Sequence, residues 1–419
     1  MSRPAGEVGA TRSRFDAVAE AVGDVFQGAA LYYLSSVVVL LGAVFGSEVV
    51  VPPTQGGDYF ADLMSACVRF DGHHYREIAD TGYRYDPADR SIVAFFPAYP
   101  LTVVVARRAT GCDLDFGLLA VSNAWLLGSF VVLARYLRHH PLLRDADRGW
   151  VALAFAVWPT TFFLRMAYAE SLFVFCTLVT LYGIVRKWPL LPLAVVAGFA
   201  SATRPVGLAV TAAYAWHVLG QPGPWRVRVL RLAVLAPMAG WGLLAYMLYQ
   251  AVAFGDPLAF ARTQVHWTSR APVERPTPSE KLEALATLEP ARGVYDPRSG
   301  RYWAQSADAN NLLFSLDFWN PALFAVAAGL VAFGAARRWL TGPEVVLGVA
   351  LLAIPYVTRS YEMSMGSHGR FAAVVIPTYL VVGRGLAKLP PPLGSALVAV
   401  SAVVLAFWSA LYAAGRTFY

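Results

Sequence analysis

Residues 70–100 read FDGHHYREIADTGYRYDPADRSIVAFFPAYP and lie between a first long apolar segment and a series of further ones. They gather acids, histidines and aromatic side chains, whereas a loop that only joins membrane helices needs little more than polar residues and turns. The apolar run from Phe95 to Ala106 ends at Arg107 and Arg108. A helical span needs about 20 residues, so this run is too short to cross a bilayer. We predict a helix that dips into the outer leaflet and returns.

The composition indicates an integral membrane protein. Of the 419 residues, 57% are hydrophobic and 15% are charged, and the mean hydropathy is +0.49. Soluble domains are about 25% charged. We therefore expect an all-α, polytopic fold forming a single transmembrane domain over residues 1–419. Apolar runs predict about eleven spans, near residues 31–51, 114–137, 149–167, 170–186, 189–202, 205–219, 230–253, 317–335, 342–357, 370–386 and 393–413.

The basic residues indicate the orientation. The net charge is +7, and membrane proteins keep Lys and Arg mainly in short cytoplasmic loops, so nucleic acid is not an expected partner. If the run 95–106 does not span, all basic clusters fall on one side; if it spans, the segment 135–148 moves to the other side. The clusters are Arg3, Arg12 and Arg14; Arg135, Arg138, Arg144 and Arg148; Arg186 and Lys187; Arg226, Arg228 and Arg231; Arg337 and Arg338; Arg384 and Lys388.

This topology puts two large loops on the outer face. The loop 52–113 contains the dipping helix, and the loop 254–316 is rich in Pro, Arg, Asp and Asn, with one short helix near 279–289. The turns at 168–170, 203–204 and 358–369 fall on the same face. The excess of arginine over lysine suggests a GC-rich genome. We therefore expect a bacterial plasma membrane with the site facing outside, or the endoplasmic reticulum membrane in a eukaryote.

Asp71 is the first candidate for chemistry. A helix over 70–80 would put Asp71, His74 and Tyr75 on one face and Glu77 on another. A carboxylate near the membrane can deprotonate a hydroxyl if hydrogen bonds and nearby charges keep it ionised. The alternative is that Asp71 caps the helix. His73 and His74 lack the spacing of a metal site, so contacts with aromatic groups or phosphate are the preferred interpretation.

Other candidates lie at the same outer level. Glu170 begins a span, where it is either functional or placed by the helix dipole. Arg204 lies between two short spans and can clamp phosphate or extend to the interface. His368 and Arg370 precede a later span and leave the same choice open. Further candidates to contact substrate are Tyr99 in the run FFPAYP, and His266 and Trp267 in the second loop.

Four motifs in order resemble the PIG-V-type mannosyltransferases. They are FDGHHYREIADTGY (70–83), VAFFPAYPL (93–101), WPTTFFLRMAYAESLF (158–173) and SATRPVGL (201–208), and the similarity extends from about residue 60 to 390. That family belongs to the GT-C membrane glycosyltransferases. In these enzymes a lipid-phosphate sugar is the donor, and the loop after the first helix holds the catalytic acid.

The resemblance assigns roles to individual residues. It puts the catalytic acid at Asp71, with Phe70 replacing the usual Trp of the family's W-D motif. Glu170 matches the Y-x-E-S-L acid and Arg204 the T-R-P motif. Arg370 corresponds to a late P-R-Y-like signature in which both neighbours have changed.

We therefore expect an inverting transfer of a hexose from a polyprenyl-phosphate sugar to a lipid, glycan or protein acceptor. Mannose is the first candidate for the hexose. Asp71 would be the general base, Arg204 with Arg370 or His368 would bind phosphate, and Glu170 would position the acceptor or support Asp71. No cofactor or metal is required for this reaction. The alternatives are a transporter of lipid-linked sugars or other solutes, in which polar residues lie near the bilayer midplane, and a ligase that uses a lipid-diphosphate glycan.

Overall fold

The computed structural model describes residues 14–50, 59–268, 277–296, 298 and 315–415. Arg3 and Arg12 of the expected basic face lie outside these ranges, as do residues 52–58 of the first outer loop and 269–276, 297 and 299–314 of the second. All regular structure within the described ranges is helical. The expected all-α class is therefore confirmed.

Five helices are long and apolar enough to cross a membrane. They are α1 (Arg14–Phe45), α5 (Leu114–His139), α16 (Leu316–Ala336), α17 (Gly342–Met363) and α20 (Pro391–Ala413). Two bent pairs raise the number to 7 if each pair forms one span: the 3-10 segment Pro159–Arg165 with α7 (Glu170–Val185), and α10 (Trp225–Ala239) with α11 (Trp241–Phe254). The expected eleven spans are therefore not confirmed.

The other expected spans are short or interrupted helices. They are α6 (Asp145–Val157), α8 (Leu190–Ser201), α9 (Leu208–Leu219) after the 3-10 turn Pro205–Gly207, and α18 (His368–Ala372) followed by α19 (Ile376–Leu386). Interrupted helices are tolerated at membrane depth where neighbouring protein satisfies the freed backbone groups. The first expected span, near residues 31–51, falls in a longer helical stretch, because α1 begins at Arg14 and a π-helical segment, Gly46–Val50, follows it.

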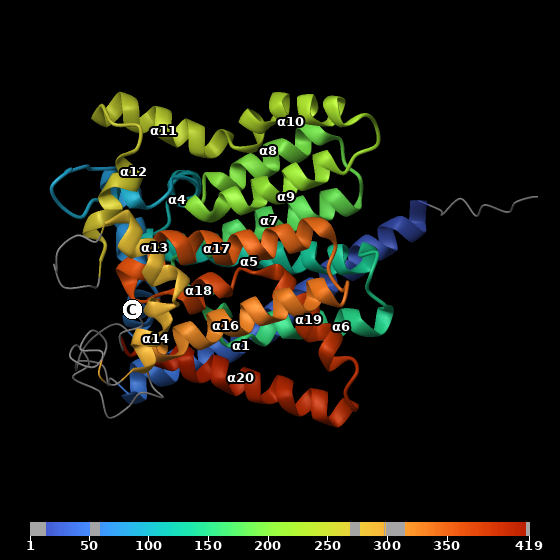
Figure 1. Ribbon diagram of the computed structural model, residues 1–419. Coiled ribbons are helices and arrows are strands. Elements are labelled where there is room, and N and C mark those ends of the chain that lie inside the picture. The colour runs from blue at the N-terminus through green and yellow to red at the C-terminus, as the bar shows by residue number, and fades with distance from the viewer. Residues whose placement is uncertain (1–13, 51–58, 269–276, 297, 299–314, 416–419) are drawn as a thin grey trace, which may run out of the picture.

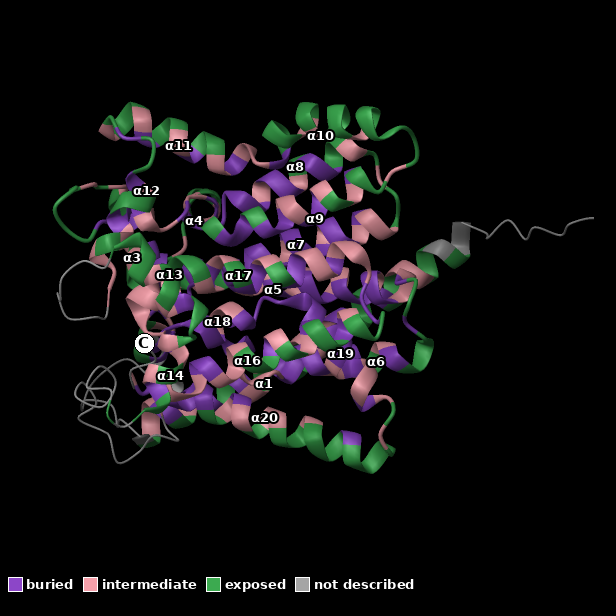
Figure 2. Cartoon of the chain, in the orientation of Figure 1, coloured by how far each residue is buried: buried purple, intermediate pink, exposed green. Residues whose placement is uncertain are grey.

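The first and last long helices pack closely through small residues. A Cβ atom at Gly42 of α1, or at Gly46 in the π-helical segment that follows it (Gly46–Val50), would collide with the backbone of Ala406 or Ala410 of α20. Small residues four apart allow two helix backbones to approach closely in a membrane. Much of α20 is exposed (Figure 2), and both helices carry exposed apolar side chains, among them Leu41 and Phe45 of α1 and Val400 and Val403 of α20.

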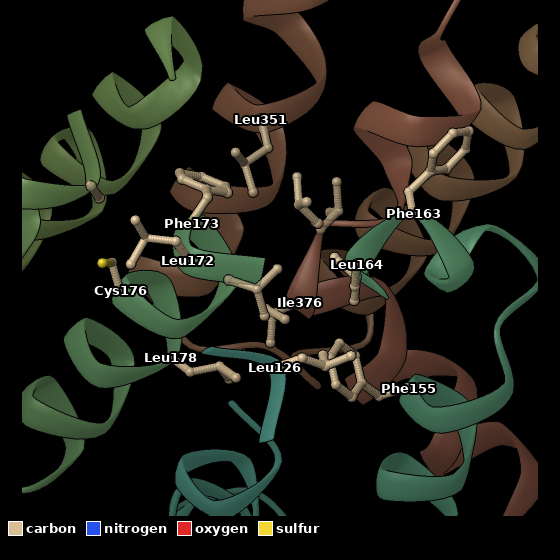
Figure 3. Close-up of a cluster of buried hydrophobic side chains, with 14 of the residues drawn as sticks. Leu126, Phe155, Phe163, Leu164, Leu172, Phe173, Cys176, Leu178, Leu351 and Ile376 are labelled. Atoms are coloured by element: carbon tan, nitrogen blue, oxygen red, sulfur yellow. The ribbon is translucent and has the colours of Figure 1, made fainter. Parts of the chain in front are cut away.

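Helix α7 lies in the core of the bundle. Its sequence ESLFVFCTLVTLYGIV is apolar on all sides after the first two residues, and such a helix is buried on all sides. Figure 3 shows Leu172, Phe173 and Cys176 of α7 packed with Leu351 of α17 and Ile376 of α19. Because α7 is central, Glu170 at its first turn is buried as well.

The chain breaks sharply before α7. Helix α6 ends at Val157, and Pro159 begins a 3-10 segment that ends at Arg165. This segment and α7 meet at an angle of 102°. Proline has no backbone N–H and fixes φ, which favours a break at this position. The break brings Phe163 and Tyr168 beside the first turn of α7.

Figure 1 shows short helices gathered at one end of the bundle, which we call the site end. They include α3 (Asp71–Thr81), α4 (Ala98–Thr110), α12 (Ala259–Arg262), α13 (Pro278–Ala286) and α14 (Glu289–Tyr295). Helix α13 agrees with the short helix predicted near 279–289, whereas α12 and α14 were not predicted. At 13 residues α4 is too short to span; its dip into the outer leaflet stays a prediction.

The opposite end carries basic connections, and we call it the basic end. Figure 1 shows the turns after α5, α9, α16 and α19 at this end. These turns contain or adjoin most of the predicted basic clusters, including Arg138, Arg144, Arg337 and Arg384. The two ends therefore differ in charge, as the sequence led us to expect for the two sides of a membrane.

Candidate functional site

Asp71 is the first residue of α3. It does not cap this helix, which was the alternative role considered from the sequence. The N-cap position is Phe70, and no side chain caps this helix. The Oδ2 atom of Asp71 instead accepts a hydrogen bond from Nη1 of Arg370 at 2.6 Å. This contact joins α3 to α18, which lie 299 residues apart in sequence.

Asp71 is one end of a chain of four alternating charges. Nε of Arg370 lies 3.2 Å from Oε1 of Glu170, and Nη1 of Arg204 lies 3.1 Å from the same oxygen. Both of these contacts are ion pairs without hydrogen-bond geometry. We call Asp71, Arg370, Glu170 and Arg204 the charge chain. Its formal charges cancel, so two carboxylates and two guanidinium groups remain together away from water.

The charge chain is more exposed at the end formed by Asp71 and Arg370 than at the end formed by Glu170 and Arg204. The side chains of Asp71 and Arg370 are 16% and 13% exposed, whereas those of Arg204 and Glu170 are 9% and 3% exposed. Of the two carboxylates, Asp71 is therefore the more exposed, and Glu170 lies deeper. The sequence predicted each of these four residues as a candidate, and the structure brings all four together.

Aromatic rings surround the guanidinium groups of the charge chain. The Arg370 guanidinium lies 5.2 Å from the ring centre of Tyr168 and 6.0 Å from that of Phe163. The ring of Phe371 lies 5.6 Å from Arg370 and 5.4 Å from Arg204. Ring faces stabilise cations by about 0.5–2 kcal/mol, more when the pair is desolvated. These rings help keep both arginines charged while excluding water.

The turn that presents Asp71 is held from behind by two tyrosines. The hydroxyl groups of Tyr168 and Tyr412 donate to the carbonyl of Arg69 at 3.3 and 3.0 Å. Phe70 has φ 58°, which is rare for a bulky residue and occurs where the surrounding structure enforces it. Tyr412 was not among the sequence candidates, because a tyrosine near the end of the last span resembles an interface anchor.

Gly369 allows α18 to lie close to α16. Its backbone N–H donates to Oδ1 of Asn320 at 2.8 Å, and a Cβ at this position would lie 2.8 Å from both that oxygen and Leu323. Gly369→Ala should therefore shift α18, move Arg370 away from Asp71 and reduce activity by about tenfold or more, as a misplacement near 1 Å can cost about 100-fold. Transfer rates measured beside those of Gly385→Ala, where a Cβ meets nothing within 4 Å, check this. Equal rates would contradict it.

A cavity of about 400 Å³ opens beside α3 at the site end. Its lining combines carboxylates, arginines and rings: His74, Glu77, Arg84, Tyr85, Asp86, Arg90, Ser91, Ile92 and Trp267. The ring of His74 stacks on Phe95 at 4.8 Å and meets Trp267 edge-on at 5.0 Å. Burial lowers the pKa of His74 despite the opposing charge of Asp71, so the imidazole is neutral at pH 7. We call this the first cavity.

A second cavity of about 530 Å³ shares His74 with the first. It is lined by Ser65, Arg69, Phe70, His73, His74 and Gly415. Asp71 itself is not among the lining residues of either cavity, but Phe70 before it lines the second and His74, one helical turn later, lines both.

Several predicted substrate contacts are buried instead. Tyr99 is 0% exposed, and its hydroxyl donates to the Leu118 carbonyl and accepts from Ser122, so in this structure its side chain faces the core and not a substrate, contrary to the expectation. His368 is also 0% exposed and packs between Phe324 and Phe371. It therefore lies behind Arg370, out of reach of a phosphate in this arrangement.

Two further candidates are Tyr75 of α3 and His266 of the second outer loop. Tyr75 is buried against Phe95 and Tyr99, and it supports the helix rather than facing a cavity. His266 bonds to the Pro87 carbonyl at 3.1 Å through Nε2. Among the described residues, no three His, Cys, Asp or Glu side chains are grouped as metal ligands.

The helical fold and the charge chain thus define a polytopic membrane protein with a charged site at one end. No protein-family model matches the chain. Its sequence is similar over 123 residues to GPI alpha-1,6-mannosyltransferase 2 of Rattus norvegicus, with 33% identity, covering 27% of this chain and 24% of the relative. The same enzyme of Mus musculus is 32% identical over 134 residues, covering 30% and 26%. The chain thus matches about a quarter of these relatives' length, less than the predicted range 60–390.

The fold was also compared with solved structures. The apo form of the Archaeoglobus fulgidus oligosaccharyltransferase is similar with a TM-score of 0.47 and 14% identity, over 93% of this chain and 56% of that chain. The same enzyme tethered to an acceptor peptide gives 0.43 and 13%, over 91% and 55%. We draw no functional conclusion from a similarity of this degree.

Proposed function

We propose that this chain is a membrane glycosyltransferase that transfers a hexose from a polyprenyl-phosphate sugar to an acceptor hydroxyl. Mannose is the first candidate for the hexose. The observation that carries the proposal is the partly exposed carboxylate of Asp71 at the open end of the charge chain. The partial similarity to GPI alpha-1,6-mannosyltransferase 2 supports the choice of mannose.

In the proposed step, the acceptor oxygen attacks the anomeric carbon opposite the phosphate. The bond from that carbon to the phosphate oxygen breaks, and polyprenyl phosphate leaves with its electron pair. Asp71 takes the proton of the acceptor hydroxyl, as a general base within hydrogen-bond reach would. Attack from the opposite side inverts the anomeric configuration.

Arg370 gives Asp71 its position. Its 2.6 Å hydrogen bond to Oδ2 fixes the orientation of the Asp71 carboxylate. Glu170 and Arg204 lie deeper and hold Arg370 from behind. We therefore propose that Arg370 and Arg204 position the base, instead of binding the donor phosphate as the sequence suggested.

The first cavity fits a polar acceptor such as a sugar. Its rings can stack on a sugar face, and the carboxylates of Glu77 and Asp86 can accept hydrogen bonds from hydroxyl groups. Arg90 supports Trp267, with its guanidinium 5.7 Å from the ring centre.

We expect Trp267→Ala to raise the acceptor KM by about tenfold, since losing a stacked ring costs about 1 kcal/mol or more, while the donor KM changes little. Initial rates at varied acceptor concentration test this. Trp225→Ala, at a 64% exposed tryptophan of α10, is the matched control. An unchanged acceptor KM in the Trp267 variant would remove the first cavity from the proposal.

The site end is proposed to face outside the cytoplasm, in a bacterial plasma membrane. The concentration of arginine and lysine at the basic end supports this orientation. The deciding experiment for the activity is incubation of the purified protein with labelled polyprenyl-phosphate mannose and a panel of acceptors, followed by mass analysis. Transfer supports the proposal. Consumption of lipid-diphosphate glycans alone would indicate a ligase, and transport without transfer a carrier.

A further inference from the structure

We propose that the second cavity binds the phosphate group of a lipid phosphate, with Arg69 as the cation that holds it. This inference rests on the proposed function, because it assigns the place of the donor's leaving group. The phosphate is expected to carry a long apolar chain rather than to be free in solution.

Arg69 differs from the arginines of the charge chain in having no acidic partner in the described part of the chain. Arg204 and Arg370 are neutralised by Glu170 and Asp71, whereas Arg69 forms no ion pair with any described residue. It lines the second cavity together with His73 and His74, and none of the described lining residues is acidic. An uncompensated guanidinium in a concave site suits a phosphate, which it can bind through two parallel hydrogen bonds.

The cavity walls carry further features that suit phosphate. Gly415 lies against Arg69, because a Cβ there would collide with Nη1 of the arginine. Ser65 adds a hydroxyl group, and His73 is exposed at the rim. Ser65 is the lining residue that comes from helix α2 (Tyr59–Cys67), the helix that precedes α3.

The same turn fixes both Arg69 and Asp71. The carbonyl of Arg69 is held by Tyr168 and Tyr412, whose hydroxyl groups also bond to each other at 3.0 Å. Two residues later, Asp71 points to Arg370. Consecutive Cα atoms are about 3.8 Å apart, so the Cα atoms of Arg69 and Asp71 lie within about 7–8 Å of each other. Both side chains therefore start from one turn that is fixed in place.

The surroundings of the second cavity favour a lipid as the source of the phosphate. Helix α2 packs on Ala43 of α1 and Ala413 of α20 through Leu63 and Ala66. These two long helices carry exposed apolar side chains, including Phe45 at the end of α1 and Phe407 in the second half of α20. A lipid chain can therefore lie against α1 or α20 while its phosphate reaches Arg69.

The test measures binding directly, without transfer. Farnesyl monophosphate is titrated into the purified full-length protein in detergent, and the shift in unfolding temperature and the number of bound molecules by native mass spectrometry are recorded. Farnesol and inorganic phosphate are titrated in parallel. We expect binding of farnesyl monophosphate, much weaker binding of farnesol, and an Arg69→Gln variant that binds on the order of tenfold to 100-fold more weakly. Stronger binding of inorganic phosphate than of farnesyl monophosphate would overturn the lipid assignment.

Three variants make the test specific. Arg76→Gln, on the exposed side of α3 where the arginine pairs with Asp115 at 2.6 Å, should bind like the wild type. Arg69→Lys should retain part of the affinity, and Ser65→Trp should block the cavity without removing the cation. Wild-type affinity in Arg69→Gln, or no binding of farnesyl monophosphate to the wild type, would overturn the inference.

The inference and the proposed function can fail separately. If Arg69-dependent binding is found but no sugar is transferred from any donor, the phosphate site stands and the proposed activity falls. If transfer occurs and Arg69→Gln leaves both the donor KM and farnesyl monophosphate binding unchanged, the activity stands and the phosphate site falls.

Discussion

Replacing Asp71 by Asn should lower the transfer rate by about 100-fold to 10,000-fold, the contribution that a positioned general base makes. Asn has nearly the same size, but its amide cannot take the proton of the acceptor hydroxyl. The substitution also removes the ion pair with Arg370, while Glu170 still faces that arginine. We therefore expect a folded protein with intact binding of both substrates and a very low kcat. Rates at saturating donor and acceptor, together with an unfolding curve, measure both quantities.

Asp80→Asn is the matched control, since it makes the same change on the same helix. Asp80 is exposed and lies 3.8 Å from Arg107 in a surface ion pair, and such pairs contribute little to stability. Its rate should equal that of the wild type. A near-normal kcat in the Asp71 variant would end the assignment of the base, and a collapsed unfolding curve would show that the carboxylate is needed for the fold instead.

Arg204→Gln should reduce the free energy of unfolding by about 3–5 kcal/mol, because removing one member of a buried ion pair leaves an uncompensated charge. In this variant Arg370 alone would face two carboxylates, Asp71 and Glu170. Adding Glu170→Gln restores the balance of charges, since Asp71 and Arg370 then remain as a pair. We therefore expect the double variant to be more stable than Arg204→Gln alone. Unfolding by SDS in mixed micelles gives the comparison.

Arg84→Gln is the control for this series. Arg84 and Glu77 form a surface pair whose side chains are 72% and 34% exposed, so its loss should cost less than about 1 kcal/mol. Strictly additive effects of Glu170→Gln and Arg204→Gln would contradict the charge chain, because residues in one network couple by about 0.5–3 kcal/mol. If Arg204→Gln instead raised the donor KM with no change in stability, Arg204 would be a phosphate ligand, as the sequence first suggested.

The sequence predicted the class of fold and the four members of the charge chain. Long apolar runs identify membrane helices because the bilayer sets their length. The acids and arginines stood out because charged groups are rare in such a chain. The sequence could not predict that the chain breaks at Pro159, which leaves α6 short of a full span, or that α10 and α11 meet at an angle of 51°. A break in an apolar run depends on which neighbouring residues bond to the freed backbone N–H and C=O groups.

The roles of individual side chains were harder to predict. Tyr99 and His368 belong to motifs that resemble functional ones, yet both are buried with 0% exposure. Arg69 and Tyr412 were not among the candidates from the sequence. Arg69 lies two residues before Asp71, which was the more obvious candidate, and Tyr412 lies at the end of an apolar helix. Which face of a helix points inward follows from packing with distant segments, which periodicity alone does not specify.

The amino-acid sequence by itself determined that the chain is helical, membrane-embedded and charged differently at its two ends, because those properties follow from local composition and the thickness of a bilayer. Only the tertiary structure decided which charges meet. The hydrogen bond between Asp71 and Arg370 joins residues 299 positions apart, and it forms because Arg370 of α18 and the turn at Arg69 and Phe70 are held against the same buried tyrosine, Tyr168.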